Sequence, residues 1–369
     1  MIVIGNPANR RVTMFQDALV AQGHPPARVV PWLELCEPGA PARLLIGDPL
    51  IRIDSSGEDD DVERALLRRG EAAARAEGVP AIAPAQLARI PREVGRILYP
   101  RQQHLGFLAV LGEIEAATTT AHVLPPPSAI RELFDKLAAS QRWSALGIPM
   151  PESLPRVREP DELRELMRER AWQTVYVKLT SGSSASCLAV FTHTATREEV
   201  VTTVEDTGRA RYNTRKLQRL VARERIDRVL GFILGEGAHV ERSIPKARID
   251  GRYFDLRVLA VDGVAAFVVM RTAPHPITNL HLGGLRGDVA ALRERVAPAA
   301  WDAAMASCVA VQRATGAFHV GVDVMFEPDL AHHRVIEGNA FGDLLPNLER
   351  DGLDVYGWQI HRLLGTVPP

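Results

Sequence analysis

Apolar runs and amphipathic stretches alternate over the first fifty residues of the chain. Short apolar runs cover residues 1–4, 28–32 and 43–53, while residues 11–23 carry apolar side chains at helical spacing. This β-α-β order predicts a parallel sheet flanked by helices. Binding sites in such sheets lie beyond the carboxyl ends of the strands, so we expect one near residues 6–11.

The segment 5–11 reads GNPANRR and lacks the G-x-G-x-x-G pattern of a dinucleotide site. Arg10 and Arg11 allow two interpretations: a solvated helix start, which we favour, and a contact to an anion or carboxylate. The acidic segment 58–61 predicts the exposed first turn of a helix, where the helix dipole favours negative charge.

The pattern changes at the proline run 125–127, which we interpret as a domain boundary because proline continues neither a helix nor a central strand. A helix is expected over 128–146, closed by Gly147. Strands are expected over 174–179 and 188–192, joined as a hairpin through a loop of small residues.

Further strands are predicted in the rest of the chain, at 238–244, 253–260, 264–271, 319–326 and 333–337. The second and third of them form a hairpin across the turn Asp262-Gly263. The predicted domains are residues 1–124, 125–237 and 238–369.

Composition and charge exclude several classes of protein. The 369 residues are enough for two or three domains, and 44 basic residues against 45 acidic ones give a formal net charge of −1. A near-neutral chain has no global field that draws it onto nucleic acid or an anionic membrane, so neither partner is expected. No signal-peptide pattern opens the chain. Three scattered cysteines suit a reducing compartment, so we expect a cytoplasmic protein in which Cys36, Cys187 and Cys308 are buried.

A candidate phosphate site follows one of the predicted strands. Lys178 stands in the segment VYVKL, directly before a loop that contains Gly182, Ser183 and Ser184. A lysine beside a donor-rich loop provides a positive charge together with N–H and O–H donors for phosphate oxygens. The loop is not a Walker A motif, because G-x-x-x-x-G-K-[ST] is absent.

Hard oxygen ligands are concentrated nearer the C-terminus. Asp323 lies in VGVDVMF, and Glu337 and Asn339 lie in VIEGN, on two neighbouring predicted strands. Mg²⁺ typically uses one or two carboxylates together with substrate phosphates and water. The three residues therefore predict a magnesium site.

Several motifs occur in a fixed order: Asp135-Lys136 before LGIPMP, then VYVKLTSGSS, HVERSIPKA, FDLRVLAVDG, VMRTA, NLHLGG, GVDVMF and VIEGN. Over roughly residues 125–347 this order resembles the ATP-grasp superfamily, in particular its glutathione synthetase and D-alanine-D-alanine ligase branch. The resemblance implies an α/β and α+β chain. An N-terminal Rossmann-like (pre-ATP-grasp) parallel-sheet domain would present a substrate, and a two-subdomain ATP-grasp fold would hold ATP between its subdomains.

The resemblance also implies which residues bind ATP. The phosphates would contact Lys136, Lys178, Ser183 and Ser184, the adenine edge would meet main-chain groups of Glu241, Arg242, Ser243 and Ile244, and a covering loop would include Asn279, Gly283 and Gly284. Asp255 and Arg257 match the D-x-R strand that flanks the nucleotide, with Asp255 the better candidate for a ribose or adenine contact. Arg271 matches the catalytic arginine that steadies the acyl phosphate and the tetrahedral intermediate.

The implied activity is that of an ATP- and Mg²⁺-dependent ligase, which joins a carboxylate to an amine through an acyl phosphate and releases ADP and phosphate. Asp323, Glu337 and Asn339 match the residues that hold one or two Mg²⁺ ions, for which Mn²⁺ can substitute. The alternatives are a phosphotransferase of the same architecture and a non-catalytic ATP-binding sensor or scaffold. The implied partners are small-molecule or peptide acids and amines, and the resemblance is consistent with a homodimer.

Other polar and sulfur-containing residues have simpler interpretations. Cys187 follows a loop with fewer glycines than the family pattern has, and we interpret it as buried packing rather than as a nucleophile. Of the adjacent His332 and His333, we expect one to point inward and one to be solvated, or both to lie in a turn.

Two histidines and a basic patch each allow two interpretations. His275 and His281 flank the expected phosphate loop, as substrate contacts or as part of a solvated loop. The basic patch from Arg211 to Arg219 is either a solvated face, which we favour, or a site for an acidic or peptide substrate.

Overall fold

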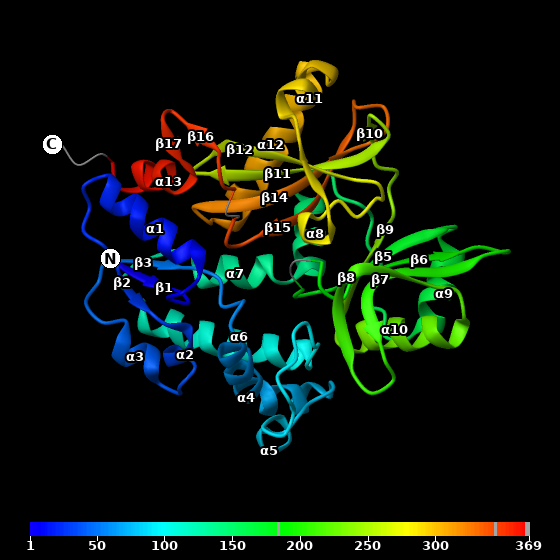
Figure 1. Ribbon diagram of the computed structural model, residues 1–369, viewed down its shortest axis with the longest axis horizontal. Helices are drawn as coiled ribbons and strands as arrows, with labels where there is room; N and C mark the ends of the chain where they lie inside the picture. The colour runs from blue at the N-terminus through cyan, green and yellow to red at the C-terminus, as the bar shows by residue number, and fades with distance from the viewer. Residues whose placement is uncertain (183–184, 343–344, 366–369) are drawn as a thin grey trace.

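The computed structural model describes residues 1–182, 185–342 and 345–365, which build three large sheets around a central region (Figure 1). The first sheet is parallel, as predicted, with the order β2-β1-β3-β4. Its strands are β1 (Ile2–Ile4), β2 (Arg28–Val30), β3 (Leu50–Ile53) and β4 (His122–Leu124). The expectation of a strand over all of 43–53 is wrong. Helix α3 (Ala40–Leu44) comes first, and Gly47, with a φ of 90°, turns the chain before β3 begins.

Helices cover both faces of the first sheet. Helix α1 (Arg10–Ala21) and the C-terminal helix α13 (Val355–Leu364) pack side by side on the face that Val3 occupies (Figure 1). Helices α4 (Asp60–Glu77) and α6 (Pro100–Ala117) lie on the other face, against Ile2 and Ile4. The alternation of side chains along β1 explains this division. The C-terminal helix α13 thus completes the apolar core beside the N-terminal sheet.

Two glycines bring α4 and α6 into close contact. A Cβ atom at Gly70 would lie 1.9 Å from the carbonyl oxygen of Gln102, and one at Gly106 would lie 1.9 Å from that of Leu66. Any larger residue would push the two backbones apart. The crossing therefore requires glycine at both positions.

The second sheet is antiparallel, with the order β8-β7-β6-β5-β9. Its strands are β5 (Thr174–Leu179), β6 (Ala189–His193), β7 (Glu198–Asp206), β8 (Arg211–Leu220) and β9 (Ala238–Arg242). Helices α9 (Pro160–Glu169) and α10 (Arg223–Gly235) share its apolar core. The β5–β6 hairpin confirms the prediction. Strands β7 and β8 were not predicted; β8 is polar along most of its length, because it is an edge strand with little burial.

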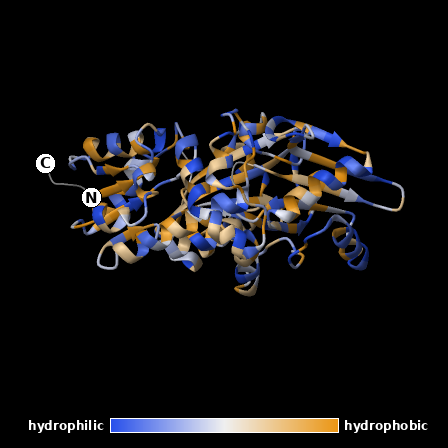
Figure 2. Cartoon of the chain, turned by 90° about the horizontal axis from the view of Figure 1, so that it is seen from below, coloured by the Kyte–Doolittle hydropathy of each residue, from blue (hydrophilic) through white to orange (hydrophobic). Residues whose placement is uncertain are grey.

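The third sheet has the order β13-β12-β11-β14-β15, with β10 paired to β11. Its strands are β10 (Arg248–Ile249), β11 (Arg252–Val261), β12 (Val264–Ala273), β13 (Leu285–Gly287), β14 (His319–Phe326) and β15 (His333–Asn339). The hairpin at Asp262-Gly263 and both late strands occur where the sequence predicts them. Helix α12 (Pro298–Thr315) packs on this sheet. Figure 2 shows hydrophobic and hydrophilic residues interspersed along the helices and strands of the chain.

The link between the first sheet and the others differs from its prediction. One helix was expected over 128–146, but the chain forms α7 (Pro127–Leu133) and α8 (Lys136–Ala145). The side chain of Asp135 accepts a hydrogen bond from the amide of Ala138, which makes Asp135 the cap of the second helix. This break places Lys136 in the first turn of α8. The remaining elements are α2 (Trp32–Leu35), α5 (Pro84–Leu87), η1 (Leu280–Leu282), α11 (Val289–Arg295), β16 (Glu349–Arg350) and β17 (Leu353–Asp354).

The cysteines and the adjacent pair His332 and His333 were also subjects of predictions. The three cysteines are buried and unpaired, as expected. His333 is buried, whereas His332 is exposed and contacts Asp329. In the described ranges, no helix has both the length and the apolar character needed to cross a bilayer.

Candidate functional site

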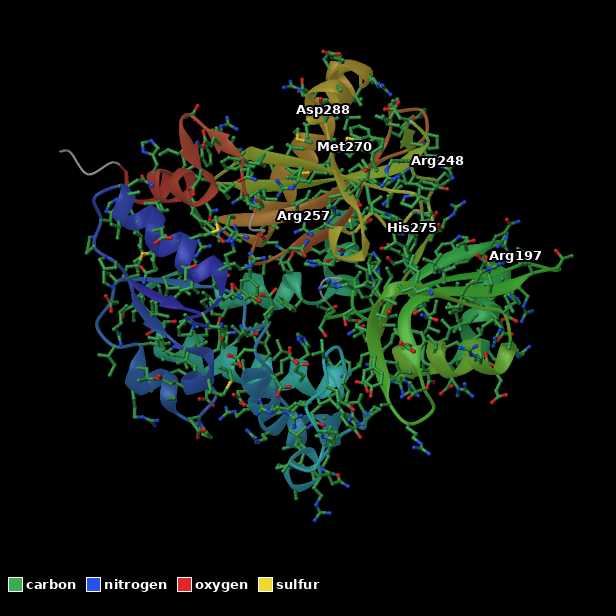
Figure 3. All side chains as sticks on the ribbon, viewed as in Figure 1. Arg197, Arg248, Arg257, Met270, His275 and Asp288 are labelled. Carbon is green, nitrogen blue, oxygen red and sulfur yellow. The ribbon has the colours of Figure 1, made fainter. Side chains whose placement is uncertain are left out.

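A cavity of about 740 Å³ lies where the three sheets meet. Its lining comes from α4 and α6 beside the first sheet, from β5 and β9 of the second, and from β11, β12, β14 and β15 of the third. Arg257, labelled on the third sheet in Figure 3, is one of the charged residues that line it. Its size and its convergent polar groups are typical of a ligand site.

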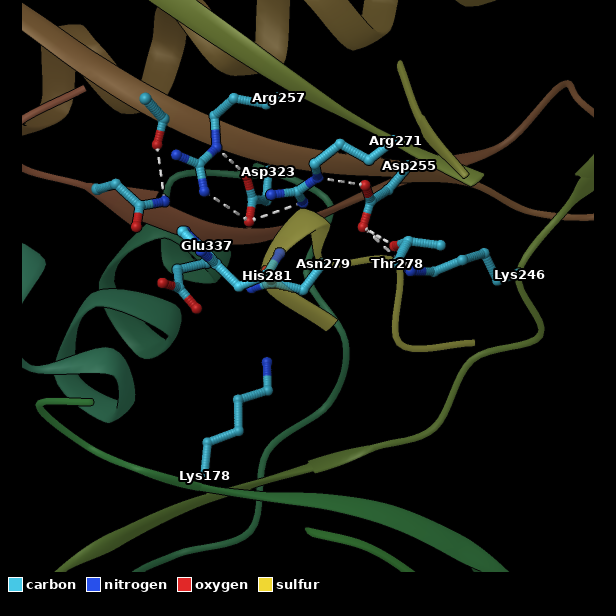
Figure 4. A network of polar contacts seen from close by, with 12 residues as sticks. Lys178, Lys246, Asp255, Arg257, Arg271, Thr278, Asn279, His281, Asp323 and Glu337 are labelled. Carbon is cyan, nitrogen blue, oxygen red and sulfur yellow. Dashed lines mark hydrogen bonds and ion pairs between the residues drawn. The ribbon is translucent and has the colours of Figure 1, made fainter. Parts of the chain in front are cut away.

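A ladder of opposite charges crosses the cavity face of the third sheet (Figure 4). In the strand register, Asp255 is paired with Arg271, and Arg257 with Asp323. Arg271 Nε lies 2.7 Å from Asp255 Oδ1, and Arg271 Nη2 lies 3.0 Å from Asp323 Oδ2. Arg257 Nε and Nη2 reach the two oxygens of Asp323 at 2.5 and 3.3 Å. The arginines hold the pKa of Asp323 at about 2 despite its burial, so this carboxylate is ionised.

Lys246 and Thr278 extend the ladder and had no role in the sequence analysis. Lys246 Nζ lies 3.2 Å from Asp255 Oδ2 and 2.9 Å from Thr278 Oγ1, and the Thr278 hydroxyl also donates to Asp255. Burial lowers the pKa of Lys246, and the charge of Asp255 opposes this effect. Lys246 stands in the motif HVERSIPKA, but no sequence signal connected it or Thr278 with Asp255.

Asp255, which was predicted to contact ribose or adenine, has three protein partners in the structure. Its side chain is buried and receives hydrogen bonds from Arg271, Lys246 and Thr278. Burial raises and the two cations lower the pKa of Asp255, and the net direction is downward. These contacts hold Asp255 and Arg271 together on the cavity face of the third sheet.

Two lysines occupy the opposite side of the cavity. Lys178 rises from β5 toward the charge ladder (Figure 4), and its Nζ lies 2.5 Å from Glu241 Oε1 on β9. Lys136 Nζ lies 3.6 Å from Glu337 Oε1 and also donates to the carbonyl of Gly182. Both predicted phosphate lysines therefore face the residues predicted to hold magnesium.

In the segment 241–244, which was predicted to contact adenine, some main-chain groups form hydrogen bonds with other parts of the chain. The amide of Arg242 donates to the carbonyl of Glu152 at 2.8 Å, and the amide of Ser243 donates to Thr174 at 3.0 Å. Both amides thus have main-chain partners, and the predicted contact of this segment with adenine stays a prediction. Arg242 and Ile244 both line the cavity. Glu241 also lines it, but as the side-chain partner of Lys178.

Three oxygen-bearing side chains share one face of β14 and β15. Asp323 is paired with Glu337 and Gly321 with Asn339, so the side chains of Asp323, Glu337 and Asn339 lie together. Asn339 Nδ2 donates to the carbonyl of Gly321 at 3.1 Å, which directs its amide group. Among the described residues there is no cluster of three His, Cys, Asp or Glu that could hold a metal by itself. Two carboxylates and one amide fit Mg²⁺ that is bound together with a phosphate ligand.

The covering loop contains a tight turn. Asn279 accepts a hydrogen bond from the amide of His281 at 2.8 Å, and Gly283 has a φ of 82°. A Cβ atom at Gly284 would lie 2.8 Å from the carbonyl oxygen of Asn279, so the turn leaves no room for one. Asn279 and His281 line the cavity. The predicted phosphate contacts Ser183 and Ser184 lie outside the described residues, although Gly182 and Ser186 beside them line the cavity.

The region near residues 6–11 also reaches the cavity, as expected from the parallel sheet. Arg11 lines it and donates to the carbonyl of Phe341 at 2.8 Å, whereas Arg10 is exposed. The contributions of α4 and α6 could not be predicted from the sequence, because the pattern of an amphipathic helix indicates its buried face but not the cavity that it borders.

Comparisons of the whole chain with known proteins show its fold. No known family model and no curated protein matches the sequence. Among solved structures, the ATP-grasp ligase PsnB complexed with a minimal precursor is 16% identical over 99% of both chains, with a TM-score of 0.55. D-cycloserine synthetase DcsG is 15% identical over 98% of both chains, with a TM-score of 0.55. The macrocyclase MdnC, bound with precursor peptide MdnA from Microcystis aeruginosa MRC, is 12% identical over 100% of both chains, with a TM-score of 0.51. PsnB has also been solved with its minimal precursor, Mg and ADP. The chain has the fold of the ATP-grasp ligases, which confirms the resemblance seen in its sequence.

Proposed function

We propose that this chain, which has the ATP-grasp fold, is an ATP- and Mg²⁺-dependent ligase that joins a carboxylate to an amine. The observation that carries the proposal is the contact of Arg271 with Asp323 across the cavity from Lys136 and Lys178. A cavity with cations on two sides and carboxylates between them suits the transfer of a phosphoryl group to an acid.

The reaction would proceed in two balanced steps. A carboxylate oxygen of the acid attacks the γ-phosphorus of ATP, the bond to the β-phosphate oxygen breaks, and ADP leaves. The amine nitrogen then attacks the carboxyl carbon of the acyl phosphate, the C–O bond to phosphate breaks, and the amine proton passes to the departing phosphate or to water. The products are an amide, ADP and phosphate.

The residues of the chain would act by position and charge. Lys136 and Lys178 would neutralise phosphate oxygens, and Lys178 would be oriented by Glu241. Arg271, held in place by Asp255, would face the charge that develops on the carboxyl oxygen. The enclosed cavity would protect the acyl phosphate from water.

Asp323, Glu337 and Asn339 would hold Mg²⁺ together with the phosphates of ATP. When bound, the ion would neutralise phosphate charge and polarise the transferring group. In the structure, both oxygens of Asp323 contact Arg257, and one also contacts Arg271. Metal binding therefore has to share this carboxylate with its two arginines.

The products of ATP turnover test this proposal. Protein with Mg²⁺, ATP, a panel of acids and a panel of amines should release ADP and phosphate only when an acid is present. AMP and pyrophosphate as products, or a stable phosphorylated acid that no amine consumes, would overturn the proposed ligase reaction.

A matched pair of variants tests the role of the site. Asp323→Asn should lose turnover by at least about a hundredfold, because the side chain loses its charge while its size is kept. Asp302→Asn, on the exposed face of α12, is the control and should retain the rate. Equal turnover in the two variants would place the reaction elsewhere.

A further inference from the structure

One wall of the cavity is aromatic. His104, Phe107, Phe134 and Phe341 all line the cavity, and we call these four residues the aromatic wall. The rings of His104 and Phe134 are stacked at 6.1 Å, and Phe134 lies 5.3 Å from Phe107 and 5.9 Å from Phe341. Such distances are typical of interacting rings.

The wall is built from three separate parts of the chain. His104 and Phe107 stand one turn apart on α6, Phe134 lies in the break between α7 and α8, and Phe341 follows β15. Phe134 and Phe341 are half-buried, so part of each ring remains accessible from the cavity. His104 and Phe107 are buried and both pack against Phe134, so the rings left for a ligand are those of Phe134 and Phe341.

The wall adjoins the residues proposed for phosphoryl transfer. Phe134 precedes Lys136 by two residues, and Phe341 follows Asn339 by two. Lys136 and Asn339 are candidates for contacts to phosphate and to magnesium, respectively. A molecule whose carboxylate receives the phosphoryl group therefore has the aromatic wall within reach of its other end.

The wall is uncharged and is extended by aliphatic side chains. Burial, with the positive charges of Arg101 and Lys136, lowers the pKa of His104 to about 3, so its imidazole is neutral at neutral pH. Leu66, Leu67 and Leu133 line the same cavity. A hydrocarbon group of the substrate placed against this surface would be removed from water, which favours its binding.

We propose that the acid substrate carries an aromatic ring, which packs on Phe134 and Phe341, with His104 and Phe107 supporting Phe134, while its carboxylate faces Lys136 and Arg271. This inference rests on the proposed ligase function, and it names the class of acid as an aryl-substituted carboxylic acid. An acidic side chain of a peptide, or a small polar acid, would leave the wall without a partner.

A trapping assay separates recognition of the acid from identity of the amine. Hydroxylamine serves as the common nucleophile: its nitrogen attacks the acyl phosphate, phosphate leaves, and a hydroxamate forms that is measured together with ADP. The acid panel is 3-phenylpropionate, 3-cyclohexylpropionate, propionate and glutarate. We expect the highest kcat/KM for the phenyl acid, lower values for the cyclohexyl acid and propionate, and the lowest for glutarate.

Two phenylalanine variants complete the test. Phe341→Ala should raise the KM for 3-phenylpropionate by about tenfold and leave the KM for ATP unchanged, because only a ring contact is removed. Phe318→Ala is the matched control, since Phe318 is also half-buried but does not line the cavity. Equal effects of the two variants would overturn the proposed ring site.

The outcomes distinguish the inference from the function on which it rests. ADP and hydroxamate formed preferentially from glutarate or from an acidic peptide would overturn the aromatic-acid inference and leave the ligase function in place. If no acid yields ADP, the ligase proposal fails. Calorimetry with 3-phenylpropionate then tests the ring site by itself. Binding that Phe341→Ala weakens would still support the ring site, and absence of binding would overturn it.

Discussion

The guanidinium of Arg271 on β12 reaches across β11 to the carboxylate of Asp323 on β14, with 3.0 Å between Nη2 and Oδ2. Strands two apart in a sheet are separated by roughly 9–10 Å, so a long side chain is needed for this contact. The contact joins the residue proposed to steady the acyl phosphate to a residue proposed to hold magnesium. The two functions therefore depend on one pair of side chains.

Arg271→Lys should lower kcat while it leaves ATP binding nearly unchanged. Lysine keeps the charge but lacks the planar fork that contacts Asp255 and Asp323 together. We expect kcat to fall by about 10²–10³-fold, the range seen when one preorganised donor is removed from a reacting centre. ADP release gives the rate and calorimetry gives the affinity for ATP. Arg295→Lys, on exposed α11, is the control. A parallel loss of ATP affinity would contradict a role confined to the reacting centre.

Lys246→Met should reduce turnover through the position of Arg271. Without Lys246, Asp255 keeps Thr278 and Arg271 as partners among the described residues, and we expect it to draw Arg271 away from Asp323. We expect kcat to fall by about tenfold, equivalent to roughly 1.4 kcal/mol in the activation barrier, at constant KM for ATP. Lys246→Arg should recover part of the rate. An arginine variant no better than the methionine variant would mean that the charge of Lys246 does not position Arg271.

Glu241→Gln should weaken ATP binding more than it slows the reaction. The carboxylate of Glu241 holds Lys178 at 2.5 Å, and an amide cannot form the same charge-assisted contact. We expect the KM for ATP to rise by about tenfold with a smaller change in kcat, because a contact common to the ground and transition states is lost. Initial rates over a range of ATP concentrations measure both parameters. Glu224→Gln, at an exposed position of α10, should match the wild type.

His104 should make the protein less stable in acid. Its pKa is about 3 in the folded protein against 6.5 when unperturbed, so below pH 6.5 the unfolded chain binds a proton that the folded chain does not. The stability present above pH 6.5 is therefore lost as the pH falls from 6.5 toward 3, by about 1.4 kcal/mol per pH unit.

Chemical denaturation at pH 8 and pH 5 measures this loss against His104→Phe. The free energy of unfolding of the wild type should fall more than that of the variant between the two values. Burial raises the pKa of Glu236 to about 7, so this residue makes the protein more stable as the pH falls. Glu236 is present in both proteins, so its contribution cancels in the comparison. The same pH dependence in both proteins would contradict a buried, neutral His104.

Gly106→Ala should destabilise the protein by several kcal/mol. The added methyl group would lie 1.9 Å from the carbonyl oxygen of Leu66, so α4 and α6 would have to separate. Gly112→Ala is the control on the same helix, because its Cβ would have only the end of the Arg131 side chain near it, at 3.9 Å. That variant should be more stable by up to about 1 kcal/mol, owing to helix propensity. Urea denaturation compares the two, and similar midpoints would rule out the close helix crossing.

Much of the fold followed from local patterns. Strands β5, β11, β12 and β14 match their predicted ranges closely, because apolar residues at strand spacing and the turn at Asp262-Gly263 are local signals. The edge strand β8 carries no such pattern, and the two-helix break at Asp135 depends on a capping hydrogen bond within otherwise continuous helical periodicity. These are the places where a weak local signal allowed more than one structure.

The sequence by itself determined that Lys178, Asp323 and Glu337 stand on recognisable strands, in an order that resembles a known superfamily, and from this order it predicted contacts to phosphate and magnesium. Only the tertiary structure decided which side chains act together. Sheet order places Arg271 beside Asp323 and Lys246 beside Asp255, and strand order is fixed by contacts between distant segments rather than by local periodicity. The aromatic wall has the same origin, because a helix, a turn and a strand end meet there only after the three sheets have packed.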